Sequence, residues 1–272
     1  QVSTEEETWK QLANTTFDLV ICMPGSDNSD TFEIARSIKN KYSHIPLVVL
    51  TPFSHGITAR MEHEDLSIFE YVFCWLGNTD LLVSIIKLIE DKMNLEHDVK
   101  EVGVQMIMLV EDSIRYYSRY LPLLYSEIVT QTQELIKNEP ENDDMSLIMK
   151  IRVRPKVILV STFEEATAVI DKYRDNLIGV ISDVKYKHNG VEDEDAGIKL
   201  IQYTHRADDK IPCLLQSHEI ENAAKAKTVN AEFINKNSVT LSHDITRFIK
   251  ERLGFGDFIF KNRNGYPIDK AR

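Results

Sequence analysis

Cysteine is scarce in this sequence: the 272 residues include only three, Cys22, Cys74 and Cys213. No two of them stand in a C-x-x-C spacing and no Cys/His cluster accompanies them, which argues against a zinc site. Unpaired cysteines in apolar segments are typical of buried free thiols in a reducing compartment. We therefore expect a cytoplasmic protein whose cysteines are structural.

Long apolar runs and an excess of basic residues are also absent. No apolar segment approaches the roughly 20 residues that a membrane-spanning helix needs, and no secretory signal is visible at the N-terminus. Lysine and arginine total 32 against 43 acidic residues, so the formal net charge is −11. Such a charge matches a phosphate backbone poorly. The sequence thus predicts neither a membrane nor a nucleic-acid partner.

The common catalytic motifs are missing as well. Glycine is limited to ten residues, and the sequence contains no glycine-rich phosphate loop, nucleophile elbow or dinucleotide fingerprint. A hydrolase or an oxidoreductase therefore lacks support. What the chain does contain is 43% hydrophobic and 28% charged residues, a composition typical of a globular protein.

Short apolar runs alternate with amphipathic helical segments along the whole chain. Continuous apolar runs bounded by turn residues indicate strands that are buried on both faces. Alternating strands and helices favour an α/β fold with a parallel sheet covered by helices on both sides. The expected strands are Leu19–Met23, Leu47–Leu50, Tyr71–Cys74, Met106–Val110, Val157–Val160, Ile178–Ile181, Cys213–Leu215 and Glu232–Asn235.

An internal repeat divides the chain into two copies of one βα pattern. The segments 17–23, 45–51 and 70–74 align without gaps with 177–183, 211–217 and 232–236. The boundary is expected near Asn94–Gly103, which gives domains over 1–96 and 104–253. The first copy lacks the two strands and the helix that open the second, so we interpret it as truncated at its N-terminus. The second copy carries a polar insertion at 137–155, and 254–272 is interpreted as a tail that leads to a further domain.

Five polar residues in the second copy follow or end four of the expected strands. They are Glu111, Asp112, Asp183, Ser217 and Lys236. In an open parallel sheet, ligands bind at the carboxyl ends of the strands, so we expect these side chains to meet at one edge. Three neighbouring carboxylates need a compensating cation, and hard oxygen ligands suit Mg²⁺. Together with an ammonium and a hydroxyl, this set can bind a transferring phosphoryl group.

The segments 110–113, 215–217 and 233–236, together with the apolar strand ending at Asp183, resemble the receiver domains of two-component response regulators. The resemblance implies two flavodoxin-like (CheY-like) doubly wound domains in tandem, the first incomplete. It makes Asp183 the phosphoacceptor and Mg²⁺ the cofactor, which Glu111, Asp112, Asp183 and the backbone carbonyl of Lys185 hold. Ser217 and Lys236 bind the phosphoryl group, and Ser217 and Phe233 form the switch.

The resemblance also implies partners: a histidine kinase or a histidine phosphotransfer protein supplies the phosphoryl group, and no separate enzymatic activity is expected. Two departures concern the site. The segment 185–190 replaces the turn that usually follows the acceptor. His218 stands where a small residue is usual, and it is expected to restrict access to the phosphoryl site. The acidic run Glu192–Asp195 is interpreted as a solvated loop.

The first copy lacks most of the residues that carry this resemblance. Met23 aligns with the acceptor and Cys74 with the lysine, and only Thr51 matches. We therefore expect that this copy cannot be phosphorylated and that it serves in a homodimer or in contact with a partner.

Three alternatives stay open at this point. Each of the five polar residues has an ordinary structural interpretation, such as a helix cap or a surface lysine. The second copy is alternatively an interaction module that works without phosphorylation. The tail around 254–268 resembles the entry into the catalytic part of phosphoenolpyruvate synthase or pyruvate phosphate dikinase-like chains, which would make the chain the regulatory front end of such an enzyme.

Overall fold

The computed structural model describes residues 2–25, 31–52, 65–137, 154–253, 258–261 and 267–271. The chain divides into two compact units. The first unit comprises Gln1–Ile89 and Ile114–Arg119, and the second comprises Glu90–Ser113 and Tyr120–Arg272. The two helices α4 (Asp80–His97) and α5 (Ile114–Lys137) each contribute residues to both units. None of the described helices combines the length and the hydrophobicity that a membrane-spanning segment requires.

The first unit is built on a three-stranded parallel sheet in the order β1-β2-β3. Its core lies between this sheet and α2, whose Phe32, Ala35 and Ile38 are buried at a spacing of three residues, as expected for the apolar face of a helix. The described elements before α4 are α1 (Glu5–Asn14), β1 (Val20–Cys22), α2 (Thr31–Lys41), β2 (Leu47–Pro52) and β3 (Tyr71–Trp75).

Side chains at the start of α5 form hydrogen bonds with backbone groups on the outer edge of β3. The Tyr117 hydroxyl donates to the Val72 carbonyl, and the Cys74 N–H donates to the Ser118 Oγ at 2.9 Å. The rings of Phe73 and Tyr117 also meet edge to face. An edge strand otherwise presents unpaired backbone groups that invite pairing with another chain. Side chains from α5 therefore close the edge that a further strand would occupy.

The second unit contains a five-stranded parallel sheet in the order β10-β9-β6-β4-β5. Counted along the chain, this is the 2-1-3-4-5 order of flavodoxin-like doubly wound folds. Its strands are β4 (Met106–Val110), β5 (Lys156–Val160), β6 (Leu177–Asp183), β9 (Cys213–Ser217) and β10 (Glu232–Asn235). The α-helices besides α4 and α5 are α7 (Phe163–Tyr173), α8 (Ala196–Ala207), α9 (Asn222–Thr228) and α10 (Leu241–Phe248). Short helices at Asp98–Val102, Arg174–Asn176 and Ile249–Leu253 complete the unit.

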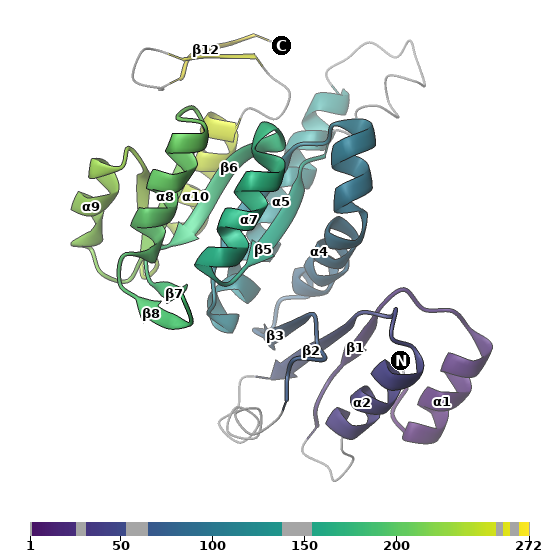
Figure 1. The fold of residues 1–272 in the computed structure, drawn as a ribbon. Helices are drawn as coiled ribbons and strands as arrows, with labels where there is room; N and C mark the ends of the chain where they lie inside the picture. The colour runs from purple at the N-terminus through teal and green to yellow at the C-terminus, as the bar shows by residue number, and fades with distance from the viewer. Residues whose placement is uncertain are drawn as a thin grey trace. The chain divides into compact units, whose positions relative to one another are not determined.

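Helices cover both faces of this sheet, with α7, α8 and α9 in front and α5 and α10 behind (Figure 1). Alternate residues of β4 point to opposite faces. Met106, Met108 and Val110 belong to the buried cluster that includes residues of α7, α8 and α9. The intervening residues of β4 are also fully buried, which is why this strand is apolar throughout.

A buried carboxylate joins the end of α4 to the start of β5. Asp91 is fully buried, accepts a hydrogen bond from Arg154 at 2.6 Å and lies 3.5 Å from the Lys156 ammonium. It also accepts from the Tyr125 hydroxyl at 2.8 Å and from the Val157 N–H at 2.9 Å. A buried charge needs such partners, because desolvation without them costs several kcal/mol.

All eight strands expected from the sequence are present, and β4 and β10 have the expected bounds. A hairpin of β7 (Tyr186–His188) and β8 (Val191–Asp193) follows β6, where we expected only irregular chain. Asn189 and Gly190, both at positive φ, form its turn, as expected for the tightest hairpin connections. Most of the insertion expected at 137–155 lies outside the described residues. Of the tail, the structure describes the strands β11 (Phe258–Lys261) and β12 (Pro267–Ala271).

Candidate functional site

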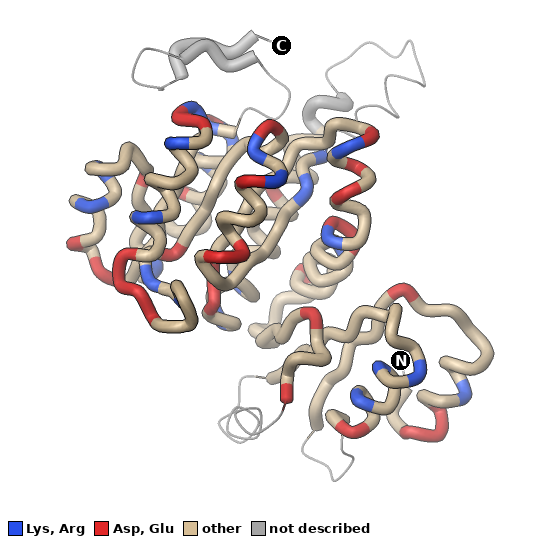
Figure 2. The backbone as a smooth tube through the Cα atoms, in the orientation of Figure 1, with Lys and Arg blue, Asp and Glu red and all other residues tan. Residues whose placement is uncertain are grey.

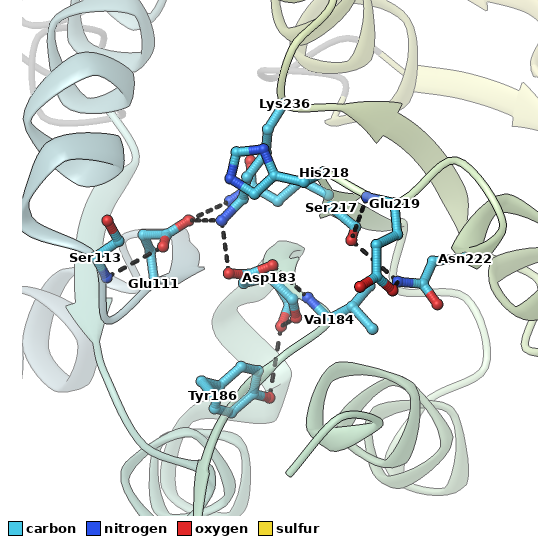
Figure 3. Close-up of polar contacts among 12 residues, drawn as sticks. Glu111, Ser113, Asp183, Val184, Tyr186, Ser217, His218, Glu219, Asn222 and Lys236 are labelled. Carbon is cyan, nitrogen blue, oxygen red and sulfur yellow. Dashed lines mark hydrogen bonds and ion pairs between the residues drawn. The ribbon is translucent and has the colours of Figure 1, made fainter. Parts of the chain in front are cut away.

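Four strands of the second unit bring polar side chains to one edge of the sheet. Glu111 and Asp112 follow β4, Asp183 ends β6, Ser217 ends β9 and Lys236 follows β10. The strands are parallel, so these ends share one edge, and the strand order reverses between β4 and β6. Ligands of open α/β sheets bind at such a reversal. Figure 3 shows most of these side chains pointing toward one another.

Lys236 joins two of the carboxylates directly. Its Nζ lies 2.8 Å from Glu111 Oε2 and 2.6 Å from Asp183 Oδ2. The side chains of Lys236 and Glu111 are 2% and 0% exposed, whereas Asp183 is 13% exposed. Asp183 is therefore the member of this group that solvent or a reactant can reach.

Burial and mutual repulsion disturb the protonation of the carboxyl groups. Burial raises the pKa of Glu111 to about 8, and the charge of Asp183 adds to the rise while Lys236 opposes it. Burial also raises the pKa of Asp112, with a further contribution from Asp183. Desolvation would lower the pKa of Lys236, but Glu111 and Asp183 raise it. The single ammonium therefore does not offset the burial and mutual repulsion of the carboxyl groups, and the raised pKa values favour the protonated forms of Glu111 and Asp112.

The carboxylates of Glu111, Asp112 and Asp183 offer ligand oxygens within 4.8 Å of one another. When all three carboxyl groups are ionised, they carry two more charges than Lys236 balances, and a divalent cation would compensate that excess and so favour the ionised forms. Oxygen donors of this kind suit Mg²⁺, which retains waters and accepts phosphate oxygens in addition to one or two carboxylates. The residues present therefore fit the Mg²⁺ ion expected from the sequence.

The backbone around Asp183 is fixed by close packing. The Val184 N–H donates to Asp183 Oδ1 at 2.7 Å, and the Gly197 N–H donates to the Val184 carbonyl at 2.9 Å. A Cβ atom on Gly197 would lie 2.1 Å from the Asp183 carbonyl oxygen. Only glycine at this position lets α8 approach the end of β6 so closely.

Ser217 makes its hydrogen bonds within its own loop. Its Oγ accepts from the Glu219 N–H at 3.2 Å and from the Asn222 amide at 3.0 Å. The next residue, His218, is exposed, and its Nδ1 lies 3.2 Å from Asn237 Oδ1. The Asn235 amide also donates to the His218 carbonyl at 3.1 Å. The loops after β9 and β10 are therefore linked by hydrogen bonds.

The acidic run Glu192–Asp195, expected as a solvated loop, is largely exposed, but its first two residues belong to β8 and basic side chains bind it. Lys185 Nζ lies 2.6 Å from Glu194, and Lys225 Nζ lies 2.6 Å from Asp195. Figure 2 shows the run as a red stretch of backbone below α8. The Lys185 side chain thus lies against the β7–β8 hairpin region, while the expected role of its carbonyl as a metal ligand stays a prediction.

Phe233 lies in β10, where it is partly buried and packs against the core of the second unit. It pairs with Leu215 of β9, two residues before Ser217. The described contacts place it beside the strand that carries Ser217, and its role as a switch stays a prediction.

Two residues of the site were not anticipated from the sequence. The Gln216 amide donates to Glu111 Oε2 at 3.2 Å, and Gln216 is only 1% exposed. A glutamine inside an otherwise apolar strand is unusual enough to have indicated a buried polar partner. Asn222, which is 4% exposed and binds Ser217, gives no comparable signal in the sequence.

At the described positions that align with Asp183 and Lys236, the first unit carries neither a carboxylate nor an ammonium. Val20 pairs with Leu47 in the same register as Val180 with Cys213, which agrees with the aligned repeat. Met23, which aligns with Asp183, is 55% exposed.

The register between β2 and β3 corrects one assignment. Thr51 pairs with Cys74, as Ser217 pairs with Asn235. Trp75, one residue later than the ungapped alignment indicated, therefore occupies the position of the lysine. The conclusion that no ammonium is present there is unchanged.

Comparisons with known proteins add no identification: no protein-family model matches the chain, and no curated protein matches it in sequence.

Proposed function

We propose that the second unit is a receiver domain that accepts a phosphoryl group on Asp183 and thereby changes the affinity of its surface for a protein partner. The observation that supports this most is the placement of Lys236 between a buried glutamate and a partly exposed aspartate at the strand-order reversal. A structural ion pair would not require a third and fourth polar group at the same edge.

In this function an Asp183 carboxylate oxygen attacks the phosphorus of a donor, which is a phosphohistidine or a small acyl phosphate. A new P–O bond forms, and the bond from phosphorus to the donor nitrogen or oxygen breaks. The electron pair of the broken bond stays on the imidazole, which takes up a proton, or on the released carboxylate. Bound Mg²⁺ would neutralise phosphoryl oxygens when Glu111, Asp112 and Asp183 hold it.

The chain's own residues supply the remaining requirements. The Lys236 ammonium is held beside the acceptor oxygen, where it can bind a phosphoryl oxygen. The Val184 N–H donates to the other carboxylate oxygen and orients it. Ser217 supplies a hydroxyl from the neighbouring strand end. Access from solvent passes His218, whose side chain is exposed at the same edge.

We further propose that the first unit is a truncated receiver-like domain without phosphoacceptor chemistry. The shared β1–β2 register supports a common fold, and the absence of carboxylate and ammonium at Met23 and Trp75 supports the loss of chemistry. Its role would be in dimerisation or partner contact.

Incubation with acetyl phosphate and Mg²⁺, followed by intact-mass measurement, tests the phosphoacceptor. We expect a gain of one phosphoryl group in the wild-type chain and none in Asp183→Asn. Asp195→Asn, which changes a half-exposed aspartate paired with Lys225, is the matched control and should still gain the group. Labelling that persists in Asp183→Asn would contradict the assignment, and absence of labelling with both acetyl phosphate and a phosphohistidine donor would favour an interaction module that works without phosphorylation.

A further inference from the structure

The hydrogen bonds around Ser217 determine which way its hydroxyl can interact. A serine oxygen has two lone pairs and one proton. Here two N–H donors, from the Glu219 backbone and the Asn222 amide, bind the oxygen at 3.2 and 3.0 Å. With both lone pairs engaged, the hydroxyl can interact with a further group only by donating its proton.

The orientation of the Asn222 amide is itself fixed by Glu219. The Asn222 Nδ2 lies 3.3 Å from Glu219 Oε2 as well as 3.0 Å from Ser217 Oγ. An ionised carboxylate can only accept hydrogen bonds, so the NH₂ group, and not the amide oxygen, must face it. That assignment directs the second N–H of the same nitrogen to Ser217.

Burial protects the two hydrogen bonds to Ser217 from competition with water. Ser217 and Asn222 are 7% and 4% exposed, so water cannot readily exchange for either contact. Both donors come from the loop and helix that follow β9, which leaves the hydroxyl proton to point away from them. A ligand that carries only acceptor oxygens, such as a phosphoryl group, matches a hydroxyl that can only donate.

We propose that Asn222 is a positioning residue that makes Ser217 an obligatory hydrogen-bond donor to the phosphoryl group on Asp183. The proposal rests on the proposed function of the second unit. It assigns Asn222 no contact with the phosphoryl group, and it predicts that the residue acts only through the Ser217 hydroxyl.

The affinity for beryllofluoride, a phosphoryl mimic that binds a carboxylate oxygen, tests the proposal by titration calorimetry of the full chain with saturating Mg²⁺. Asn222→Asp keeps the shape but replaces the donor by an acceptor, so the Ser217 proton turns to the new carboxylate. We expect a loss of affinity of about tenfold or more, the effect of one hydrogen bond to a charged group. Asn222→Ala frees one lone pair without offering a new acceptor, and we expect a loss of about two- to fivefold. Glu219→Gln retains an acceptor oxygen, so its affinity for beryllofluoride should stay within about twofold of wild type.

The same two Asn222 substitutions in a Ser217→Ala background complete a double-mutant cycle. Because the hydroxyl is then absent, Asn222→Ala should have no further effect, and Asn222→Asp should have only its smaller charge effect. Equal losses in both backgrounds, or an unchanged affinity in Asn222→Asp with native Ser217, would overturn the role of Asn222 while leaving the receiver function intact. A wild-type chain that binds no beryllofluoride would overturn both. If Asn222→Ala fails to fold, judged by thermal melting, the near-isosteric Asn222→Asp decides alone.

Discussion

Removing the ammonium from the centre of the site should destabilise the second unit strongly. In Lys236→Met, Glu111 and Asp183 lose partners at 2.8 and 2.6 Å. At an effective dielectric constant of about 20, Coulomb's law gives about 6 kcal/mol for each contact before desolvation is subtracted. Lys236 is only 2% exposed, and because its removal also removes the cost of desolvating the ammonium, the net loss is smaller. Breaking a buried ion pair on one side costs about 3–5 kcal/mol, and we expect a loss of that size at neutral pH.

The assay is urea unfolding of the full chain in EDTA, because a bound divalent cation would replace part of the missing positive charge. Because burial already raises the pKa of Glu111 to about 8, this carboxyl takes up a proton at neutral pH when Lys236 is removed. A second substitution, Glu111→Gln, should therefore leave the free energy of unfolding of Lys236→Met unchanged within about 1 kcal/mol, or raise it. Lys227→Met, which changes an exposed lysine of α9, is the matched control and should stay within about 0.5 kcal/mol of wild type. A loss below about 1 kcal/mol in Lys236→Met, or further destabilisation beyond that margin by Glu111→Gln, would refute the reasoning.

Two further substitutions test the packing against the end of β6 and the ion pairs of the acidic run 192–195. Gly197→Ala would place a Cβ 2.1 Å from a backbone oxygen of β6, so we expect the free energy of unfolding in urea to fall by about 1–3 kcal/mol or more. Gly190→Ala, at positive φ but in open space, is the control and should lower it by only about 1 kcal/mol. Equal losses in the two variants would contradict the close approach of α8 to β6. Asp193 has a pKa well below its usual value because Lys199 and further donors bind its carboxylate. Its contribution is therefore complete above the unfolded pKa of about 3.9 and declines as the pH falls below it. Asp193→Asn should cost about 0.5–2 kcal/mol at pH 7, and the difference from wild type, followed by thermal melting, should shrink below pH 4 rather than grow.

The sequence by itself determined the class of fold and the edge at which polar residues gather. Apolar runs such as 106–110 indicate buried strands, because a run of that length is too short for a helix of ordinary length and is bounded by polar residues on both sides. Parallel strands present their carboxyl ends at one edge, so residues that follow four such strands must lie near one another. That reasoning needs only local patterns and one topological rule.

The contacts within the site were decided by the tertiary structure. Glu111 and Lys236 are 125 positions apart, and no local pattern reports whether their side chains touch. The Gln216 contact with Glu111 and the Asn222 contact with Ser217 likewise depend on rotamers that the surrounding packing selects. The β7–β8 hairpin also escaped notice, because three-residue strands are too short for an alternating pattern to stand out.

The residue that aligns with Lys236, which is Trp75 and not Cys74, shows why the register of a strand cannot be deduced from its own sequence. An ungapped alignment of the two copies assumes that both β2–β3 and β9–β10 pair in one register. The backbone hydrogen bonds of the first unit are shifted by one residue, and a shift of one residue turns every side chain of a strand to the opposite face. Apolar periodicity along a single strand specifies that a strand exists and which faces are buried, whereas its register is set by the neighbouring strand and by the side chains that close its outer edge, here Tyr117 and Ser118 of α5.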